Sequence, residues 1–342
     1  MNFKKKGLWA LASFLLAVFT VWFIIYRSGM SMSDFLAAVG AANPWWILMG
    51  IVCMFGYVFF EGAALLQIIR TCGYPQKVSR GFMYAAADTY LSAITPSGSG
   101  GQPGIALFMM KDGVPAAVIT AALIVNLIGF NVGLLFHGIL GMIFGYETFI
   151  NYNTLGKVLV IVGFVVFIGL TILAAMMLKH REFIFRFAMK MTTFLHKIHL
   201  LRDPERIHRK LGRIMEEYKT CVDVVSSHKG MWFRACLMNI IQRFAQIAIT
   251  VFAFRALGGH GGTFRLFGTQ CLATIGSTCI PIPGAMGVSD YLMIEGYEQL
   301  MPKEFAFQVQ MLSRSLSFYS CVIICGITMV IGLILIGRKE KK

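Results

Sequence analysis

Two short segments of this chain are rich in Gly, Pro and Ser, the residue types that leave backbone amides open to a ligand. They comprise Thr95, Pro96, Ser97, Gly98, Gly100, Gly101, Gln102 and Pro103 in the first segment, and Pro281, Pro283, Gly284 and Gly287 in the second. Uncovered N–H groups next to a helix N-terminus bind anions such as phosphate. We therefore predict that both segments bind a phosphate group. The alternative is that these glycines only allow close helix packing or a kink.

Five ionisable side chains lie within otherwise apolar stretches, where a charge is costly and usually faces a cavity or a partner. They are Glu61, Asp88, Arg243, Asp290 and Arg314. We expect them to line a polar cavity, in which the arginines bind phosphate and the carboxylates meet an ammonium group or an arginine. The alternative is a set of buried structural pairs, such as Arg314 with Asp290.

Other polar residues in these stretches favour a structural interpretation. His137, Asn126 and Asn131 lie on one predicted helix, and we interpret them as interhelical hydrogen-bonding groups, with a proton relay as the alternative. The eight cysteines form no CxxC pair, and no Walker loop, catalytic triad or metal-ligand spacing is present. The sequence predicts no cofactor and no metal site.

The amino-acid composition indicates whether these side chains lie in water or in a lipid bilayer. Hydrophobic residues make up 57% of the 342 residues and charged residues 14%, whereas soluble domains carry about 25% charged residues. The chain is therefore predicted to be an all-α integral membrane protein. The formal net charge is +15, but the basic residues cluster at the ends of apolar stretches, which favours contact with anionic lipid over nucleic acid.

Six stretches are long enough to cross about 30 Å of hydrocarbon as helices. They run at about 8–27, 45–69, 114–143, 155–178, 232–257 and 304–337, and the last is long enough to be broken or tilted. The apolar segments 81–111 and 266–300 each contain one of the Gly- and Pro-rich breaks. Each half is too short to span, so we predict two re-entrant broken-helix hairpins.

The distribution of basic residues sets the expected orientation. With the N-terminus inside, cytoplasmic segments hold 23 of the 31 Lys and Arg residues. This asymmetry predicts that both termini are cytoplasmic. We expect the protein to lie in the plasma membrane. The first hairpin then enters from the cytoplasm and the second from outside. We predict two inverted repeats, residues 1–150 and 151–342, an arrangement typical of transporters.

The segment 179–231 is the largest expected soluble part. Its first half has the pattern of an amphipathic helix on anionic lipid. Asp203 and Pro204 then have the types expected at the start of a second helix. The alternative is a basic linker that only packs its apolar face.

The motifs at the two breaks resemble those of a known family. Thr95-Pro96, Gly100-Gly101 and Pro103, followed by Lys111-Asp112-Gly113, resemble one motif of the lysylphosphatidylglycerol synthase/flippase membrane-domain family. The run from Pro281 to Gly287 and then Asp290 resembles the other, although relatives tend to have Glu where Asp290 stands. The resemblance covers nearly the whole chain, as a stand-alone membrane domain. The multiple peptide resistance factors of this family make lysyl-phosphatidylglycerol and move it to the outer leaflet, which lowers the attraction of the surface for cationic peptides.

Residues and resemblance together predict flippase-like movement of a phosphate-bearing lipid between leaflets, with aminoacylated phosphatidylglycerol as one candidate. The expected partners are membrane lipids, and the sequence also allows a homo-oligomer or a separate synthase subunit. Aminoacyl transfer from tRNA needs a soluble domain, and 179–231 is too small for one, so synthesis is the first alternative, alone or with a partner subunit. The others are an ion-coupled transporter of an anionic solute and a scaffold that recruits partners through 179–231.

Overall fold

The computed structural model describes residues 37, 39–95, 98–179, 204–285 and 287–339, and every regular element in them is helical. The expected first span, 8–27, lies outside the described residues. So do the first half of the 179–231 segment and the expected cap Asp203.

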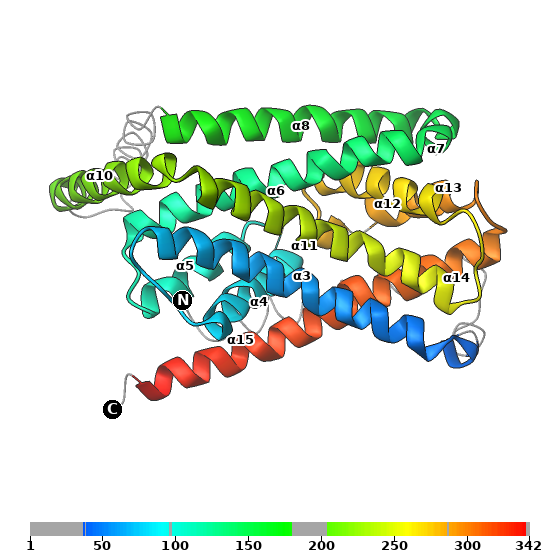
Figure 1. Ribbon diagram of the computed structural model, residues 1–342, viewed down its shortest axis with the longest axis horizontal. Helices are drawn as coiled ribbons and strands as arrows, with labels where there is room; N and C mark the ends of the chain where they lie inside the picture. Colours follow the sequence, from blue (N-terminus) through cyan, green and yellow to red (C-terminus); the bar gives the residue numbers. More distant parts are fainter. Residues whose placement is uncertain (1–36, 38, 96–97, 180–203, 286, 340–342) are drawn as a thin grey trace.

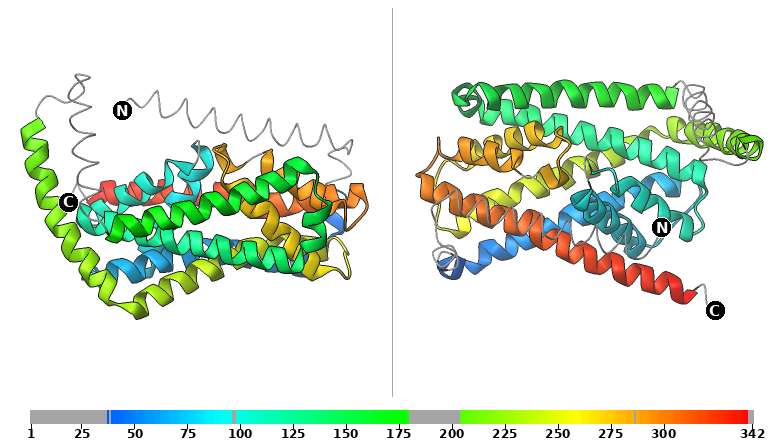
Figure 2. Two further views of the ribbon diagram at one scale, coloured as in Figure 1. Left: turned by 90° about the horizontal axis from the view of Figure 1, so that it is seen from above. Right: turned by 180° about the vertical axis from the view of Figure 1, so that it is seen from behind.

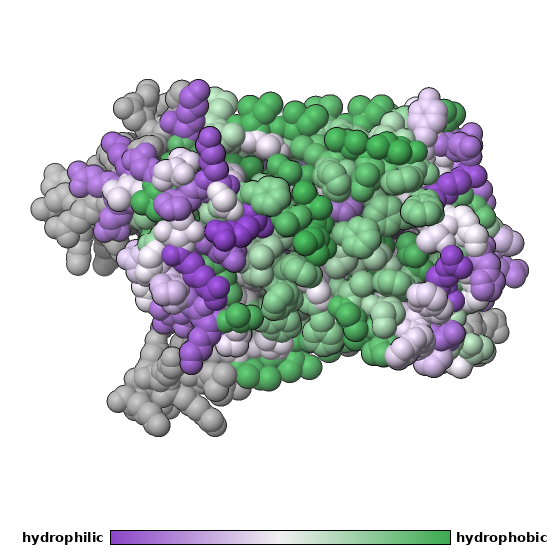
Figure 3. Space-filling model, viewed as in Figure 1, coloured by the Kyte–Doolittle hydropathy of each residue, from purple (hydrophilic) through white to green (hydrophobic). Residues whose placement is uncertain are grey.

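Five helices in the described part of the chain are long and apolar enough to cross a membrane. They are α3 (Pro44–Thr71), α6 (Ala116–Phe144), α8 (Thr154–Lys179), α11 (Lys229–Ala256) and the continuous helix formed by α14 and α15. They run along the same direction of the molecule (Figure 1). In the space-filling view an apolar band separates hydrophilic residues at the two ends (Figure 3). The chain is a multi-pass membrane protein.

The last span has an irregular turn in its middle, as its length indicated. α14 (Lys303–Arg314) continues through the π-helical turn η3 (Ser315–Tyr319) into α15 (Ser320–Lys339). The hydroxyl of Ser320 donates to the carbonyl of Ser315 at 2.7 Å. Such π turns widen a helix locally and are frequent at functional sites.

The first hairpin consists of α4 (Val78–Ile94) and α5 (Gly101–Lys111). Its two ends meet at one end of the molecule (Figure 1), where the Gln76 amide donates to the Asp112 carbonyl at 3.5 Å and the Arg80 guanidinium lies 3.5 Å from the Asp112 carboxylate. The segment therefore enters and leaves on one side. α5 begins at Gly101, and Pro103 fits in its first turn, where the missing N–H of a proline has no partner to lose.

The second hairpin consists of α12 (Thr263–Thr278), the short turn η2 (Pro283–Ala285) and α13 (Val288–Tyr297). It lies at the opposite end of the bundle from α4 and α5 (Figures 1 and 2). The Tyr297 hydroxyl donates to the Gln270 side chain and so joins its two helices. The tip of this hairpin, η2, contacts α4 of the first hairpin.

Glycines allow the close crossings that hold the hairpins against the long helices. A Cβ at Gly62 of α3 would lie 2.4 Å from the carbonyl oxygen of Gly81 in α4. A Cβ at Gly163 of α8 would lie 2.3 Å from the carbonyl oxygen of Ile275 in α12. Small residues at such crossings let backbones approach closely in membranes.

Two helices outside the spans complete the described fold. α10 (Pro204–Ser227) begins at Pro204, as expected, and buries Tyr218, Val222 and Val225 against the bundle. The apolar face of this part of α10 is therefore covered by protein. α7 (Tyr146–Asn151) is a short helix between α6 and α8 that the sequence did not indicate.

Candidate functional site

A cavity of about 530 Å³ lies where the two hairpins meet the long helices. Asp88, Ser92, Gly98 and Gln102 line it from the first hairpin. Pro281, Gly284 and Ser289 line it from the second, and Glu61, Arg243 and Arg314 from α3, α11 and α14. The volume is within the range of small-molecule sites.

The structure divides the predicted site residues into three groups. The cavity is lined by Glu61, Asp88, Gly98, Gln102, Arg243, Pro281, Gly284 and Arg314. Thr95, Gly100, Gly101, Gly287 and Asp290 are not among its lining residues. Pro96, Ser97 and the side chain of Pro283 lie outside what the structure describes.

Some polar groups in the turn of the first hairpin bond to other groups of the same hairpin. The Thr95 hydroxyl donates to the Leu91 carbonyl at 2.6 Å and accepts the Gly100 N–H at 2.8 Å. A Cβ at Gly101 would lie 2.1 Å from both the Asp88 Oδ1 and the Ser92 Oγ. At Gly100 and Gly101 these contacts favour the packing interpretation over anion binding.

The turn of the second hairpin is closed by a carboxylate. The Gly287 N–H donates to Asp290 Oδ2 at 3.0 Å, so the start of α13 is capped by its own side chain. Gly284 has a φ of 60°, and a Cβ there would lie 2.5 Å from the Phe318 ring. An aspartate at this helix N-terminus already supplies the negative charge that a phosphate would bring, which weakens the expected anion site at Gly287.

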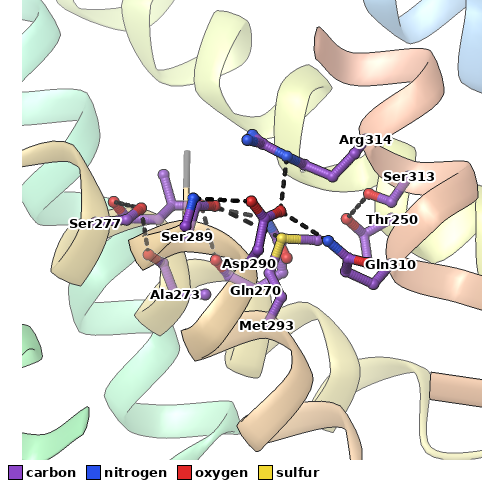
Figure 4. Close-up of polar contacts among 12 residues, drawn as sticks. Thr250, Gln270, Ala273, Ser277, Ser289, Asp290, Met293, Gln310, Ser313 and Arg314 are labelled. Carbon is purple, nitrogen blue, oxygen red and sulfur yellow. Dashed lines mark hydrogen bonds and ion pairs between the residues drawn. The ribbon is translucent and has the colours of Figure 1, made fainter. Parts of the chain in front are cut away.

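Arg314 and Asp290 form the buried pair that the sequence suggested as a structural alternative (Figure 4). The Arg314 Nε lies 3.0 Å from Asp290 Oδ1, and Gln310 Nε2 donates to the same oxygen at 2.7 Å. Within the described residues, Nη2 of Arg314 has no hydrogen-bond partner. The guanidinium stacks 4.9 Å from the centre of the Phe318 ring. One edge of Arg314 is therefore paired, and another is available at the cavity.

Arg243 enters the cavity from the facing helix, α11. The residue is 4% exposed, and its guanidinium lies 4.5 Å from the centre of the Phe130 ring. One nitrogen donates to Gln246. The other, Nη2, has no partner among the residues that the structure places. A buried guanidinium nitrogen without an acceptor is an expected position for an anionic oxygen.

Glu61 and Asp88 come together beside Arg243. Their carboxyl groups lie within hydrogen-bonding reach of each other. Glu61 is 4% exposed and accepts the Gln242 amide at 3.2 Å, whereas Asp88 is partly exposed at the cavity. Sequence reasoning placed both carboxylates in a cavity, but sequence alone does not indicate that they contact each other.

Asn131 is a cavity residue that the sequence interpretation assigned differently. It is fully buried, and neither polar atom of its amide has a hydrogen-bond partner in the described part of the chain. The expectation of interhelical bonding is correct for Asn126, which accepts from Asn239 of α11 at 3.2 Å. Asn131 and His137 make no such bond within the described residues, where the His137 ring bonds to Gly133 of its own helix. The sequence signal that could have placed Asn131 at the cavity is its polar amide in the middle of an apolar helix.

Comparison with known families agrees with this architecture. The family model described as the lysylphosphatidylglycerol synthase TM region matches residues 10–325. The chain belongs to the lysylphosphatidylglycerol synthase transmembrane-region family. The match extends over both hairpins and every residue that lines the cavity, so the cavity is part of the membrane region that defines the family. No curated protein shows a detectable match to the chain.

Proposed function

We propose that the protein moves a phosphate-bearing lipid between the two leaflets, with the head group in the central cavity. The observation that carries this proposal is the pair of arginines at the cavity. Arg243 and Arg314 come from different long helices, and each has an Nη2 without a partner in the described residues. Two such nitrogens offer a phosphate the charged donors that replace its hydration.

The surroundings of the two arginines support binding of a head group rather than of a whole lipid. The cavity also offers the amide of Asn131 and the side chain of Gln102, whereas the outer faces of the long helices are apolar. Val165 of α8 and Ile323 of α15, for example, are 64% and 62% exposed. Acyl chains can therefore remain in the bilayer while the polar group crosses through protein.

The two hairpins supply a route for alternating access. Their bases lie at opposite ends of the molecule and their tips meet at the cavity. Movement of one hairpin opens the cavity toward one leaflet, and movement of the other opens it toward the opposite leaflet. Discontinuous helices that meet near the bilayer midplane act in this way in other transporters.

A leaflet assay on the purified protein tests the proposal. Liposomes contain phosphatidylglycerol or lysyl-phosphatidylglycerol with a fluorescent acyl chain, and outer-leaflet quenching is followed with time. We expect wild type to equilibrate at least one of these lipids. Arg243→Gln should slow it by about 10- to 100-fold, because a hydrogen bond to a charged group contributes about 1.5–3 kcal/mol. Arg243→Lys keeps the charge and should retain part of the rate.

Arg265→Gln is the matched control. Arg265 pairs with Glu147 at 2.8 Å, is 44% exposed and lies outside the cavity lining, so its loss should leave the rate unchanged. Equal rates for wild type and Arg243→Gln would contradict the assignment of the head-group site. Uptake of soluble glycerophosphate without any lipid movement would instead support transport of a soluble anion.

A further inference from the structure

The Glu61–Asp88 pair at the cavity carries more negative than positive charge around it. Glu61 lies in α3 and Asp88 in α4, and their carboxyl groups are within hydrogen-bonding reach of each other. The nearest guanidinium is that of Arg243, since Arg314 is paired with Asp290. Two ionised carboxylates beside one guanidinium leave one negative charge in excess. Because a buried excess charge is costly, the pair needs one further positive charge when the cavity holds no lipid.

The other titratable groups packed around the pair do not supply that positive charge. Besides the pair itself and Arg243, the groups whose charges act on Glu61 or on its neighbour Tyr57 are the phenol of Tyr57 and the thiols of Cys321 and Cys325 in α15. A phenol and a thiol are either neutral or negative. The missing charge must therefore come from a proton or from a bound cation.

The atoms beside the pair are oxygen ligands of the kind that hold a small cation. The Gln242 amide donates through Nε2 to Glu61 at 3.2 Å, and Gln242 is 1% exposed. Its Oε1, on the same amide group, is buried and has no partner among the residues that the structure places. Ser92 adds a hydroxyl next to Asp88. Carboxylate, amide and hydroxyl oxygens together form a set of ligands that suits a hard cation.

The charge and the access of the site select a monovalent ion. One Na⁺ ion neutralises the excess charge, whereas a divalent ion would leave a positive charge in excess at membrane depth. Asp88 is partly exposed at the cavity, and Glu61 lies deeper. A cation can therefore reach the pair from the cavity, and water in the cavity can complete its coordination.

We propose that the Glu61–Asp88 pair binds one Na⁺ ion when the cavity holds no lipid. Na⁺ and the single proton that the pair can share carry the same charge, so one replaces the other without changing the net charge of the cluster. When Na⁺ binds, both carboxyl groups are ionised and the shared proton goes to water. The ligands come from α3, α4 and α11, so the ion links the first hairpin to two long helices. This site goes beyond the proposed movement of lipids and does not depend on it.

Binding of radioactive Na⁺ to the purified protein, in a detergent without phospholipid, tests the proposal. Choline chloride keeps the ionic strength constant, and we expect saturable binding of one ion per chain. Because Na⁺ and the proton compete for one pair, lowering the pH by one unit should raise the half-saturating Na⁺ concentration about tenfold. Unlabelled Na⁺ should displace the bound ion at a lower concentration than Ca²⁺, whose second charge the site does not balance.

Glu61→Gln and Asp88→Asn keep the size of each side chain and remove one negative charge. Arg243 then balances the remaining carboxylate, so Na⁺ binding should be lost at concentrations that saturate wild type. Arg243→Gln should do the opposite and lower the half-saturating Na⁺ concentration, because it removes a positive charge beside the ion. Glu304→Gln, at an exposed residue outside the cavity lining, is the matched control and should bind Na⁺ as wild type does.

The outcomes separate this inference from the proposed function. If wild type moves lipid in the leaflet assay but binds no Na⁺, or if Glu61→Gln and Asp88→Asn bind it unchanged, the ion site is wrong and the translocation stands. Tighter binding of Ca²⁺ than of Na⁺, or Na⁺ binding that does not respond to pH, also overturns the site, because the charge count forbids both. Saturable, pH-dependent binding that both carboxyl variants lose supports the site even if no lipid moves.

Discussion

At the residue scale, the same side-chain type has different roles in the two hairpins. Asp290 forms an ion pair with Arg314 and accepts hydrogen bonds from Gln310 and from the Gly287 N–H, so its negative charge is compensated. Asp88 instead faces another carboxyl group, that of Glu61. We infer that Asp290 stabilises the second hairpin, whereas Asp88 remains available to ligands.

Asp290→Ala should destabilise the folded protein strongly. It leaves the Arg314 guanidinium buried without its counter-charge, and removal of one partner of a buried ion pair costs about 3–5 kcal/mol. Thermal unfolding in detergent measures the effect. The double variant Asp290→Ala/Arg314→Met removes both charges and should recover most of the loss. Equal destabilisation of the single and double variants would show that Asp290 acts mainly as the cap of α13.

At the element scale, the re-entrant hairpins depend on close backbone contact as much as on the prolines that interrupt them. Gly101 starts α5 directly against Asp88 and Ser92 of α4. Gly62 and Gly163 allow the long helices to approach the carbonyls of the hairpins. Gly101 therefore has both a packing role and an effect on the site, because its close packing sets the position of the Asp88 carboxyl group that lines the cavity.

Gly101→Ala should destabilise the protein by about 1–3 kcal/mol, the usual cost of overpacking. Its Cβ would displace Asp88 and Ser92, which line the cavity, so lipid movement in the leaflet assay should slow as well. Gly169→Ala in α8 is the control, because a Cβ there has open space around it and alanine favours a helix. Detergent unfolding of both variants measures the difference. Equal stability of the two variants would show that α4 and α5 can move apart to fit the added methyl group without lowering the free energy of unfolding.

At the scale of the whole molecule, the two hairpins lie at opposite ends of a bundle with an apolar band (Figures 1 and 3). The order of long helix, hairpin and long helix occurs twice in the described chain, as α3 to α6 and as α11 to α15. We propose that residues 1–150 and 151–342 are inverted repeats, with both termini in the cytoplasm of a plasma-membrane protein. The tips of both hairpins line one cavity, so the hairpin bases report on orientation better than the tips do.

Single cysteines at the two bases test this orientation in a variant that lacks the eight native cysteines. Lys77→Cys precedes α4 and His260→Cys precedes α12, and both positions are exposed. A membrane-impermeant maleimide added to intact cells should label His260→Cys and leave Lys77→Cys unlabelled until the cells are opened. Labelling of both from outside would contradict re-entry from opposite sides.

The sequence by itself determined the membrane class and the position of the elements. Long runs of apolar residues have only one stable environment, and their lengths match the bilayer, so the expected spans 45–69, 114–143, 155–178 and 232–257 correspond closely to α3, α6, α8 and α11. The breaks near Thr95 and Pro281 were equally readable, because proline and glycine act on the local backbone. Both signals are local, so they do not depend on how the rest of the chain packs.

Only the tertiary structure decided which polar groups meet. Glu61 and Asp88 lie on different helices, and so do Arg243 and the Phe130 ring beneath it. Helical periodicity shows which face a residue occupies, but the rotation and crossing of each helix decide its neighbours. The same uncertainty made Asn131 a predicted interhelical link, when its amide is without a partner in the described structure and lines the cavity. In an apolar bundle the few polar contacts depend on packing between elements distant in sequence, and that packing is a property of the whole molecule.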